Sequence, residues 1–464
     1  MPGILKKITR FFSATAPLVT AEVKPSALRL SRDQHGISRK AIDNSALDVL
    51  YDLKRAGYEA YLVGGGVRDL LLGLEPKDFD IVTNAKPEQV KDVFKHRCQL
   101  IGRRFRLAHV RFGRQIVEVA TFRGEDDGKE RQQDQTGRLI RDNVYGTLEE
   151  DVWRRDFTVN ALYYDIRDFS LVDHVNGLAD LKAGQLRLIG DPSTRYHEDP
   201  VRMIRAVRFA AKLGFNIEAQ TEKPLFELGR LLLDVSNARM FDEVIKLFHS
   251  GVGLEVFEKL RHYDLFKCLF PLTDALLASE QEHFPRQLVI EALKSTDNRV
   301  REDKPVNPAF LFAAFLWEPM MQRRDLHLSA GLSPQDAFFA ACNDVIEQQV
   351  KRTAIPKRFS SQVRDIWNLQ FRLPKRFGPK AAQLRAHPRF RAAYDFIGIR
   401  LAAGESELAE LFNWWTEYQE KDPVAQVAFA NEIRPMRDKK PRKRKPANRN
   451  LFRRKSRDAD GEMD

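Results

Sequence analysis

A run of three glycines after a short apolar stretch, followed by two closely spaced aspartates, constrains this chain more than any other feature. Tyr61-Leu62-Val63 has the apolar character of a strand and leads into Gly64-Gly65-Gly66. Twelve residues separate Gly65 from Asp78-Phe79-Asp80, which leads into a second predicted strand at 79–82. Because strand side chains alternate between faces, we expect Asp78 and Asp80 to point the same way.

These residue types favour metal-assisted phosphate chemistry. Two carboxylates on one face suit Mg²⁺, and two such ions can activate an attacking hydroxyl and stabilise leaving pyrophosphate. The glycines let a phosphate approach the backbone, and a short helix beginning near Val67 directs its N-terminus at negative charge. Glu118, on a predicted neighbouring strand, is a candidate third acid or an outward-facing strand residue. Taken singly, the aspartates fit a solvated turn and the glycines a plain turn.

The predicted elements around these residues alternate between strands and helices. We expect helices at 38–56 and 87–94, a hairpin of 107–112 and 115–121 around Gly113, and strands at 159–164 and 171–175. Segment 124–150 is polar without an apolar period, which predicts a loop. After about Gly184 apolar residues recur three and four apart, which predicts helices. The fold class is therefore α+β, with a small mixed sheet in the head and a helical remainder.

Two further clusters carry residues suited to nucleotide binding. Residues 154–161 offer an arginine fork, a carboxylate and an amide, which can hold a ribose and phosphates; a salt-bridged strand entrance is the plainer interpretation. Residues 198–202 place Pro200 in the first turn of a helix, Asp199 at its N-cap and Arg202 on the same face. A capping aspartate with a helical ion pair explains this second cluster without function.

Segment 62–69 and the Asp78-Phe79-Asp80 pair resemble the DNA polymerase β superfamily of nucleotidyltransferases. The closer resemblance is to its class II branch, which contains bacterial poly(A) polymerases and CCA-adding enzymes. It is dense from about residue 32 to 248 and looser to Trp414-Trp415. It implies a polymerase-β-like head, two Mg²⁺ ions and ATP as substrate, with sugar recognition at 154–161 and base reading at 198–202. The implied residues are Asp78, Asp80 and Glu118 for catalysis, Asp78 and Asp80 for metal, and Gly64, Gly65, Arg68, Arg154, Asp156, Asn160, Asp199, Arg202, Arg205 and Arg208 for nucleotide binding.

The C-terminus carries the formal charge excess of the chain. The net charge is +12, and residues 434–457 hold eight Arg and five Lys against one acid. Such a block repels itself, so we expect a disordered arm that grips a polyanion. Expected RNA contacts are Arg442, Lys443, Arg444, Lys445, Arg453 and Arg454. We divide the chain into a disordered N-terminal segment (1–35), a nucleotidyltransferase head (36–183), a helical neck with the base-reading motif (184–250), a helical body or RNA-binding arm (251–432) and a disordered basic tail (433–464).

Three features favour poly(A) synthesis over CCA addition. Within 236–243, Ala238-Arg239 resembles bacterial poly(A) polymerases, whereas CCA-adding enzymes usually carry Glu at the alanine position. Segment 100–110, with Arg103, Arg104 and Arg106, resembles a poly(A) polymerase signature. The tail suits an enzyme that accepts many RNAs.

We therefore expect a polynucleotide adenylyltransferase adding AMP from ATP to RNA 3′ ends in RNA processing and decay. The alternatives are a CCA-adding enzyme and an inactive RNA-binding protein; transfer to a small molecule leaves the tail unexplained.

Cysteines and hydropathy indicate the compartment. Cys98, Cys268 and Cys342 are widely spaced and form neither a metal motif nor a disulfide framework, which fits the reducing cytoplasm. The sequence contains no run of about 18 apolar residues, so we expect no helix that crosses a bilayer. The expected partners are RNA 3′ ends, ATP and the RNA-decay machinery, without stable membrane insertion; oligomeric state stays open. The basic residues 1–12 fit a disordered lead-in, a transit peptide or a membrane contact, and Trp414 and Trp415 fit helix packing better than RNA stacking.

Overall fold

A computed structural model describes residues 27–102, 106–124, 132–133, 139–141, 144–279 and 284–433. The contacts divide the chain into two compact units, one of residues 1–364 with 399–404 and one of residues 365–398 with 405–464. The expected RNA contacts of the tail, as well as Arg103 and Arg104, lie outside the described residues. In the part of the chain that is described, no helix has the length and apolarity to cross a membrane.

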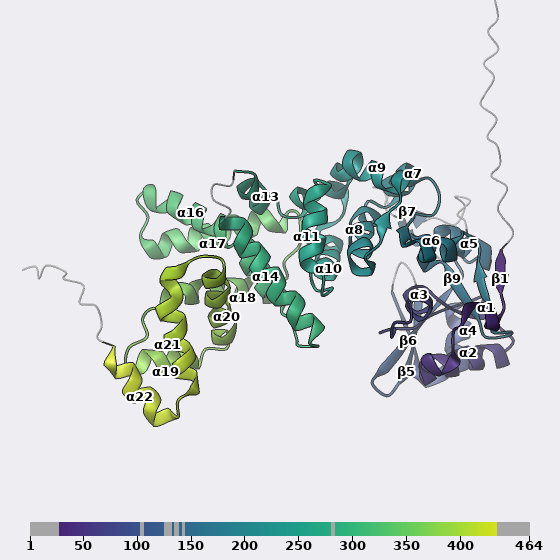
Figure 1. Ribbon diagram of the computed structural model, residues 1–464, viewed down its shortest axis with the longest axis horizontal. Coiled ribbons are helices and arrows are strands. Elements are labelled where there is room, and N and C mark those ends of the chain that lie inside the picture. Colours follow the sequence, from purple (N-terminus) through teal and green to yellow (C-terminus); the bar gives the residue numbers. More distant parts are fainter. Residues whose placement is uncertain are drawn as a thin grey trace, which may run out of the picture. The chain divides into compact units, whose positions relative to one another are not determined.

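The head contains an eight-stranded mixed sheet (Figure 1). Its order is β1-β10-β9-β2-β3-β6-β5-β4, in which β3 and β6 are parallel and the other neighbours are antiparallel. The strands are β1 Leu28–Leu30, β2 Ala60–Val63, β3 Asp80–Thr83, β4 Cys98–Ile101, β5 Leu107–Phe112, β6 Gln115–Thr121, β9 Leu162–Asp165 and β10 Leu171–Asp173. Two small pairs are separate from it: β7 Gln132–Gln133 with β8 Leu139–Arg141, and β11 Gln185–Leu186 with β12 Asn216–Ile217. A mixed sheet followed by helices confirms the predicted α+β class.

The predicted hairpin is confirmed in its bounds, and its turn contains Gly113 at a φ of 61°. Residues 158–160 instead form a 3₁₀ turn, so β9 starts later than the predicted strand at 159. The segment 124–150, predicted as a loop, ends in helix α5, Leu148–Arg154. Thr147 caps α5, and Glu149, Glu150 and Asp151 stand in its first turn, where the helix dipole stabilises negative charge.

The prediction of disorder up to residue 35 is wrong for residues 28–35. β1 pairs antiparallel with β10, and helix α1, Arg32–His35, follows. Side-chain hydrogen bonds add to this strand pairing: Arg29 donates to Ser170 Oγ at 2.7 Å and to Asp168 Oδ2 at 2.9 Å. Such long-range polar contacts leave no apolar period in the sequence, which is why the pattern missed them.

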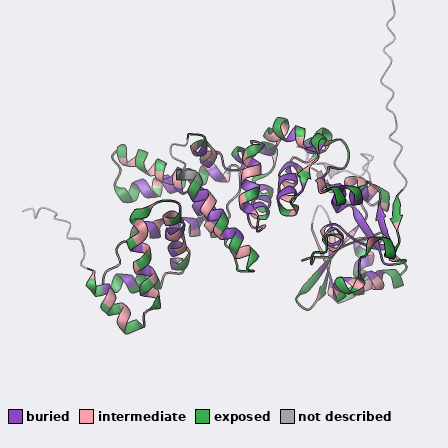
Figure 2. Cartoon of the chain, in the orientation of Figure 1, coloured by how far each residue is buried: buried purple, intermediate pink, exposed green. Residues whose placement is uncertain are grey.

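Helices make up most of the chain after the head (Figure 1). The head also holds α2 Asn44–Arg55, α3 Gly65–Leu71, α4 Pro87–Phe94 and α6 Gly177–Ala183. The later helices are α7 Pro192–Glu198, α8 Val201–Leu213, α9 Ala219–Leu228, α10 Asn237–Phe248, α11 Gly253–His262, α12 Phe266–Leu269, α13 Pro271–Ala278, α14 Phe284–Arg301, α15 Pro308–Phe315, α16 Trp317–Ser329, α17 Pro334–Val350, α18 Lys357–Arg372, α19 Pro379–Arg385, α20 Phe390–Ala402, α21 Ala409–Glu420 and α22 Pro423–Glu432. Their inner sides are buried and their outer sides exposed (Figure 2), as the helical period predicted.

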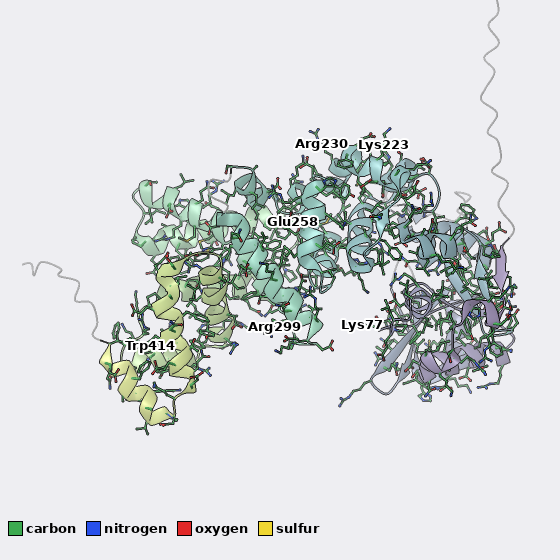
Figure 3. The ribbon with its side chains drawn as sticks, viewed as in Figure 1. Lys77, Lys223, Arg230, Glu258, Arg299 and Trp414 are labelled. Carbon is green, nitrogen blue, oxygen red and sulfur yellow. The ribbon has the colours of Figure 1, made fainter. Side chains whose placement is uncertain are left out.

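The second unit has its own aromatic core. Trp415 is fully buried, donates its indole N–H to Leu373 O at 3.2 Å and meets Phe390 edge to face. Trp414, labelled in Figure 3, stacks on Tyr418 and Phe429. Helix packing is therefore what these two tryptophans do, as predicted.

Candidate active site

The glycine run and the aspartates meet at the start of α3. Gly64 adopts a φ of 78°, which favours glycine, and α3 begins at the next residue. A Cβ on Gly66 would lie 3.1 Å from the carbonyl oxygen of Asp78 and 3.3 Å from the Phe79 ring. A Cβ on Gly64 would lie 3.5 Å from Asp80 Oδ2. The N-terminus of α3 and the loop that carries the acids are thus packed as closely as glycine allows.

The sheet register brings Glu118 beside Asp80. The two residues are direct partners in the parallel pair of β3 and β6, and partners in register point to the same face. Glu118 Oε1 also lies 3.2 Å from Nε2 of His109, its partner on β5, although the two do not align as a hydrogen bond. Lys77, on the loop that leads into Asp78, is labelled in Figure 3.

Negative charge accumulates around Asp80. The surrounding protein and the nearby Glu118 carboxylate raise the pKa of Asp80, with Asp78 adding to the effect and Arg155 opposing it. The Asp80 side chain nevertheless stays open to solvent on this face. A cation at this position would relieve the repulsion between the carboxylates.

The residues present fit Mg²⁺. In the described part of the chain, no three His, Cys, Asp or Glu side chains are grouped closely enough to hold a metal by themselves. Mg²⁺ commonly takes one or two carboxylates and completes its shell with water and substrate phosphates, so an open aspartate pair is the expected form of such a site. Asp78 and Asp80 remain the candidate ligands, and Glu118 does not close a three-carboxylate group with them.

The predicted arginine fork at 154–155 does not form. Arg154 donates to Gly124 O, whereas Arg155 bonds Asp151 Oδ2 at 3.0 Å and the Tyr163 hydroxyl at 2.7 Å. The two arginines are the last residue of α5 and its C-cap, so their side chains leave the helix in different directions. The Arg155 network lies within the head, and its positive charge opposes the rise in the pKa of Asp80.

Arg68 and Asn160 are joined to each other. Arg68 is 2% exposed, donates to Asn160 Oδ1 at 2.6 Å and pairs with Asp69 Oδ1 at 2.8 Å. Its guanidinium also lies 5.6 Å from the centre of the Phe209 ring. Arg68 therefore ties the glycine helix to the 158–160 turn and to α8, and it is closed to direct contact with a ligand.

Helix α8 carries cations close to Asp156, Arg68 and Asp69. Arg205 Nε donates to Asp156 Oδ2 at 3.0 Å. Burial acts to raise the pKa of Asp156, but the Arg205 guanidinium and the hydrogen bonds from Phe157 N and Asn160 together outweigh it, and the pKa is lowered. Arg208 Nε is buried without a hydrogen-bond partner, and burial together with Arg205 lowers the pKa of Arg208. Burial and neighbouring cations also lower the pKa of Lys212. Such mutual repulsion suits a polyanionic ligand such as a triphosphate. Lys212 was missed, although its spacing from Arg205 and Arg208 on one helix face was visible in the sequence.

The ion pair between Asp199 and Arg202, which was the interpretation of this cluster without function, is absent, because each has another partner. Arg239 Nη2 donates to Asp199 Oδ2 at 2.7 Å, and Arg202 Nη1 pairs with Glu198 Oε2 at 3.0 Å. Asp199 precedes α8 in an extended conformation, with Pro200 as the N-cap, so it does not share the helix face of Arg202. Its Oδ1 still accepts weakly from Val201 N at 3.3 Å. The sequence indicated Arg239 only because Ala238-Arg239 resembles bacterial poly(A) polymerases, and it did not predict the hydrogen bond of Arg239 to Asp199.

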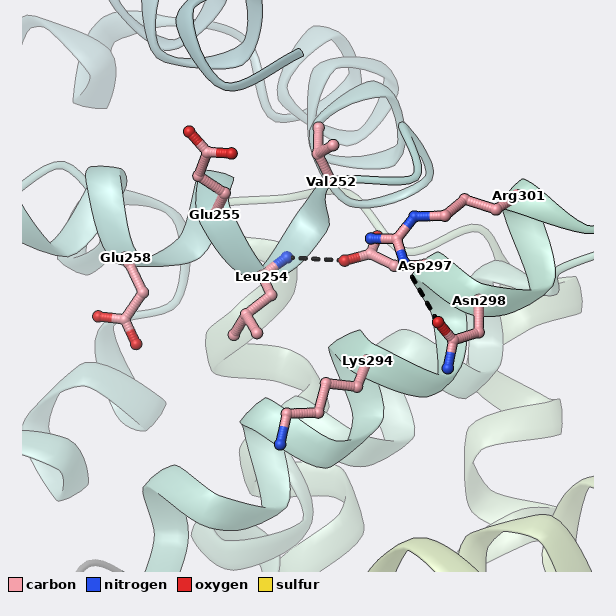
Figure 4. Close-up of a pocket in the computed structure, with 8 residues that line it drawn as sticks. All are labelled: Val252, Leu254, Glu255, Glu258, Lys294, Asp297, Asn298 and Arg301. Atoms are coloured by element: carbon pink, nitrogen blue, oxygen red, sulfur yellow. Dashed lines mark hydrogen bonds between the residues drawn. The ribbon is translucent and has the colours of Figure 1, made fainter. Parts of the chain in front are cut away.

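A cavity of about 550 Å³ lies elsewhere, between α11 and α14 (Figure 4). Asp297 accepts there from Gly253 N at 2.7 Å and Leu254 N at 3.0 Å, which caps α11. None of the predicted nucleotide-binding residues lines it. A second cavity, of about 570 Å³, adjoins the loop before the aspartates and is lined in part by Gly73, Lys77 and Phe79.

A mixed sheet with a helix that starts at the glycines and an Asp-x-Asp sequence that leads into strand β3, followed by helices, defines a nucleotidyltransferase of the polymerase-β-like class. Solved structures with this fold include a tRNA-processing enzyme in apo form (TM-score 0.56, 23% identity, covering 83% of this chain and 93% of that one). They also include the Thermotoga maritima CCA-adding enzyme complexed with tRNA (TM-score 0.55, 20% identity, covering 85% and 86%). At these identities the likeness is one of fold.

Sequence comparison is more specific. Family models match for the poly A polymerase head domain at 60–187, the probable RNA and SrmB-binding site of polymerase A at 214–277, and the polymerase A arginine-rich C-terminus at 330–449. Poly(A) polymerase I of Salmonella typhi is 49% identical over 92% of this chain and 94% of its own length. That of Haemophilus influenzae is 49% identical over 83% and 86%. The CCA-adding enzyme of Lactobacillus helveticus is 40% identical over only 46% and 52%. The chain belongs to the bacterial poly(A) polymerase family, which confirms the predicted resemblance and favours poly(A) over CCA addition.

Proposed function

We propose that this chain adds AMP from ATP to RNA 3′ ends without a template, at the site formed by Asp78 and Asp80. The observation that carries the proposal is the crowding of carboxylates around Asp80, open to solvent beside the glycine N-terminus of α3. A phosphate chain between this face and the cations of α8 would meet the metal ligands on one side and Arg205 and Arg208 on the other.

The reaction joins the RNA to the α-phosphate of ATP. The 3′ oxygen loses its proton and bonds to the α-phosphorus, while the bond to the β-phosphate breaks and pyrophosphate leaves. Asp78 and Asp80 would hold Mg²⁺, which when bound would neutralise charge that develops on the reacting oxygens. Arg205, fixed by Asp156, and Arg208 hold the triphosphate in place. The Arg68–Asn160 bond keeps the glycine helix in register with this set.

Adenine reading rests on Asp199 and Arg202. Arg239 engages Oδ2 of Asp199, whereas Oδ1 accepts only the long bond from Val201 N and has a second lone pair for the exocyclic amine of adenine. Arg202, held by Glu198 and by the carbonyl oxygen of Arg195, donates to a ring nitrogen. Fixed partners for both residues favour one base over others, because a mismatched base leaves a polar group unpaired.

The state of the cysteines supports a cytoplasmic location for this enzyme. The described cysteines Cys98, Cys268 and Cys342 are buried and free of disulfides, as in a reducing compartment. We place the enzyme in the cytoplasm, with the RNA-decay machinery as the consumer of its tailed product and the basic tail as an added grip on RNA.

Extension assays test the proposal. Purified protein, Mg²⁺ and a labelled generic RNA receive ATP, CTP, GTP or UTP separately, beside a tRNA lacking its 3′ end. We expect a long ladder with ATP alone, its loss in Asp80→Ala, and RNA binding by that variant within about twofold of wild type, because a metal ligand adds little to backbone binding. Asp92→Ala, an exposed aspartate on α4, is the matched control. Addition of only C, C and A to the tRNA would identify a CCA-adding enzyme, and RNA binding without any addition would identify an inactive binder.

A further inference from the structure

A strongly basic segment outside the catalytic motifs joins α17 to α18. Residues 348–364 contain five cations and no acid. Four of them lie at the junction of the two helices, which we define as the turn between the end of α17 and the first turn of α18. Lys351 and Arg352 follow α17, and Lys357 and Arg358 are the first residues of α18. Among the described residues, none of these four forms an ion pair. We call Lys351, Arg352, Lys357 and Arg358 the junction cations.

Local stability does not account for these charges. Cations after the C-terminus of α17 suit its dipole, but Lys357 and Arg358 stand in the first turn of α18, where a helix dipole disfavours positive charge. Neither has an acidic partner to offset that cost. A bound polyanion would compensate all four charges at once.

The backbone that carries the junction cations is held firmly. Between the two pairs of cations, Thr353 and Ile355 are buried, and Thr353 N donates to Gln349 O at 2.9 Å. The buried Gln349 side chain donates in turn to Leu269 O at 2.7 Å. Lys351, Lys357 and Arg358 remain exposed around this fixed turn. A preformed set of cations binds a polyanion at a smaller entropy cost than a mobile one.

The junction is tied to the helix that carries Arg239. Asn237 Nδ2 donates to Val350 O, and Ala354 N donates to Asn237 O, each at 2.9 Å. One turn along α10, Phe241 stacks on Phe359 with ring centres 5.8 Å apart. Asn237 and Phe241 therefore hold one face of α10 against the junction.

The opposite side of α10 reaches the base-reading pair. Arg239 is two residues from Asn237, which places it about 200° around the helix, and it binds Asp199. The junction and Asp199 thus lie on either side of one helix, separated by roughly its thickness of about 10 Å. A polyanion at the junction is close to the nucleotide that is added.

We propose that the junction cations bind the phosphate backbone of the RNA within its last few nucleotides. The inference rests on the proposed function, because it takes RNA as the polyanion that must approach the base-reading pair. It assigns to the junction a role separate from that of the basic tail: the tail grips RNA at any position, whereas the junction holds the end that is extended.

The test compares two triple variants that each lose three charges. The first is Lys351→Ala/Lys357→Ala/Arg358→Ala. The control is Lys54→Ala/Lys91→Ala/Lys182→Ala, three exposed lysines of the head. Both keep the tail, so its binding is a common background. Anisotropy of a labelled single-stranded RNA is measured at several salt concentrations, with circular dichroism melting to compare folding. Should the junction variant melt early, the same substitutions to Gln replace it.

We expect the junction variant to bind RNA roughly 10- to 100-fold more weakly near 0.1 M salt, with a salt slope smaller by about 2, since each phosphate contact on a single strand contributes about 0.7. Its KM for RNA should rise while its KM for ATP stays within twofold of the control, a change of less than ~0.5 kcal/mol. The loss should persist with an RNA of about six nucleotides, because the proposed contact lies within the last few nucleotides of the RNA.

Two results would overturn the assignment. Equal RNA affinity and salt slope in the junction variant and the control would show that the junction binds no RNA. A loss confined to long RNAs would place the contact far upstream of the 3′ end. RNA binding needs no nucleotide addition, so failure of wild-type extension with ATP would count against the proposed function alone.

Discussion

Arg239 connects two segments that are forty residues apart, since it neutralises the aspartate proposed to read adenine. The pair is partly open, with half of the Arg239 side chain and a quarter of the Asp199 side chain exposed. A carboxylate that is held by one oxygen has fewer orientations, which sharpens hydrogen bonding by the other. Arg239 is therefore a positioning residue for base selection.

We predict that Arg239→Ala lowers kcat/KM for ATP about tenfold, because a hydrogen bond to a charged group stabilises by about 1.5 kcal/mol. The value for CTP should change less, so the ATP preference falls. Steady-state extension of a generic RNA with each nucleotide measures both. Arg239→Lys, which keeps the charge, should recover part of the preference; a parallel loss for all four nucleotides would contradict the positioning role.

Helix α10 joins the base-reading pair, the cations of α8 and the basic junction through successive turns. Its C-cap, His249, is set within the protein, and burial lowers the pKa of His249 to about 4. The unfolded chain takes up this proton below about pH 6.5, whereas the folded chain resists it until about pH 4. The contribution of the neutral His249 ring to the free energy of unfolding is therefore complete above pH 6.5 and declines as the pH falls toward 4.

We predict that acidification from pH 7 to pH 5 destabilises wild type more than His249→Gln. The difference should be at most about 2 kcal/mol, because one pKa unit corresponds to 1.36 kcal/mol and the ring is not wholly enclosed. Urea unfolding at the two pH values, followed by far-UV circular dichroism, measures it. Equal pH dependence in the two proteins would exclude His249 as the titrating group.

The two compact units of the chain have separate cores, which predicts separate responses to core mutations. Trp415 is fully buried in the unit of 365–398 with 405–464, and truncating it leaves a large cavity. We predict that Trp415→Ala destabilises this unit by about 3–5 kcal/mol and leaves ATP binding by the head within twofold. Scanning calorimetry should show one unfolding transition at a lower temperature than in wild type, while the transition of the other unit stays unchanged.

Trp414→Ala provides the comparison, because Trp414 is only partly buried on the same helix. Its effect should be less than half as large. A single transition that shifts as a whole in Trp415→Ala would mean that the units unfold together, and loss of ATP binding would mean that the head depends on the second core.

The candidate metal and nucleotide residues could be proposed from the sequence because their motifs are local. The glycine run, the Asp-x-Asp pair and the β5–β6 hairpin each depend on neighbouring residues and on strand alternation, so spacing alone indicated them. The charge of residues 434–457 is likewise a property of composition. The α+β class followed from the change of apolar period after the head.

Partners that are distant along the chain required the folded structure. Asp156 meets Arg205 across 49 residues and Asp199 meets Arg239 across 40. Local spacing offered Asp199 only Arg202, three residues away, as an ion-pair partner. Likewise, β1 joins a strand more than 130 residues later. A charged side chain takes whichever opposite charge packing brings within reach, and that choice depends on how helices and strands cross in space. Residue types and their local spacing therefore determined which chemistry this chain can perform, and long-range packing decided which of those residues are open to a nucleotide and which hold others in place.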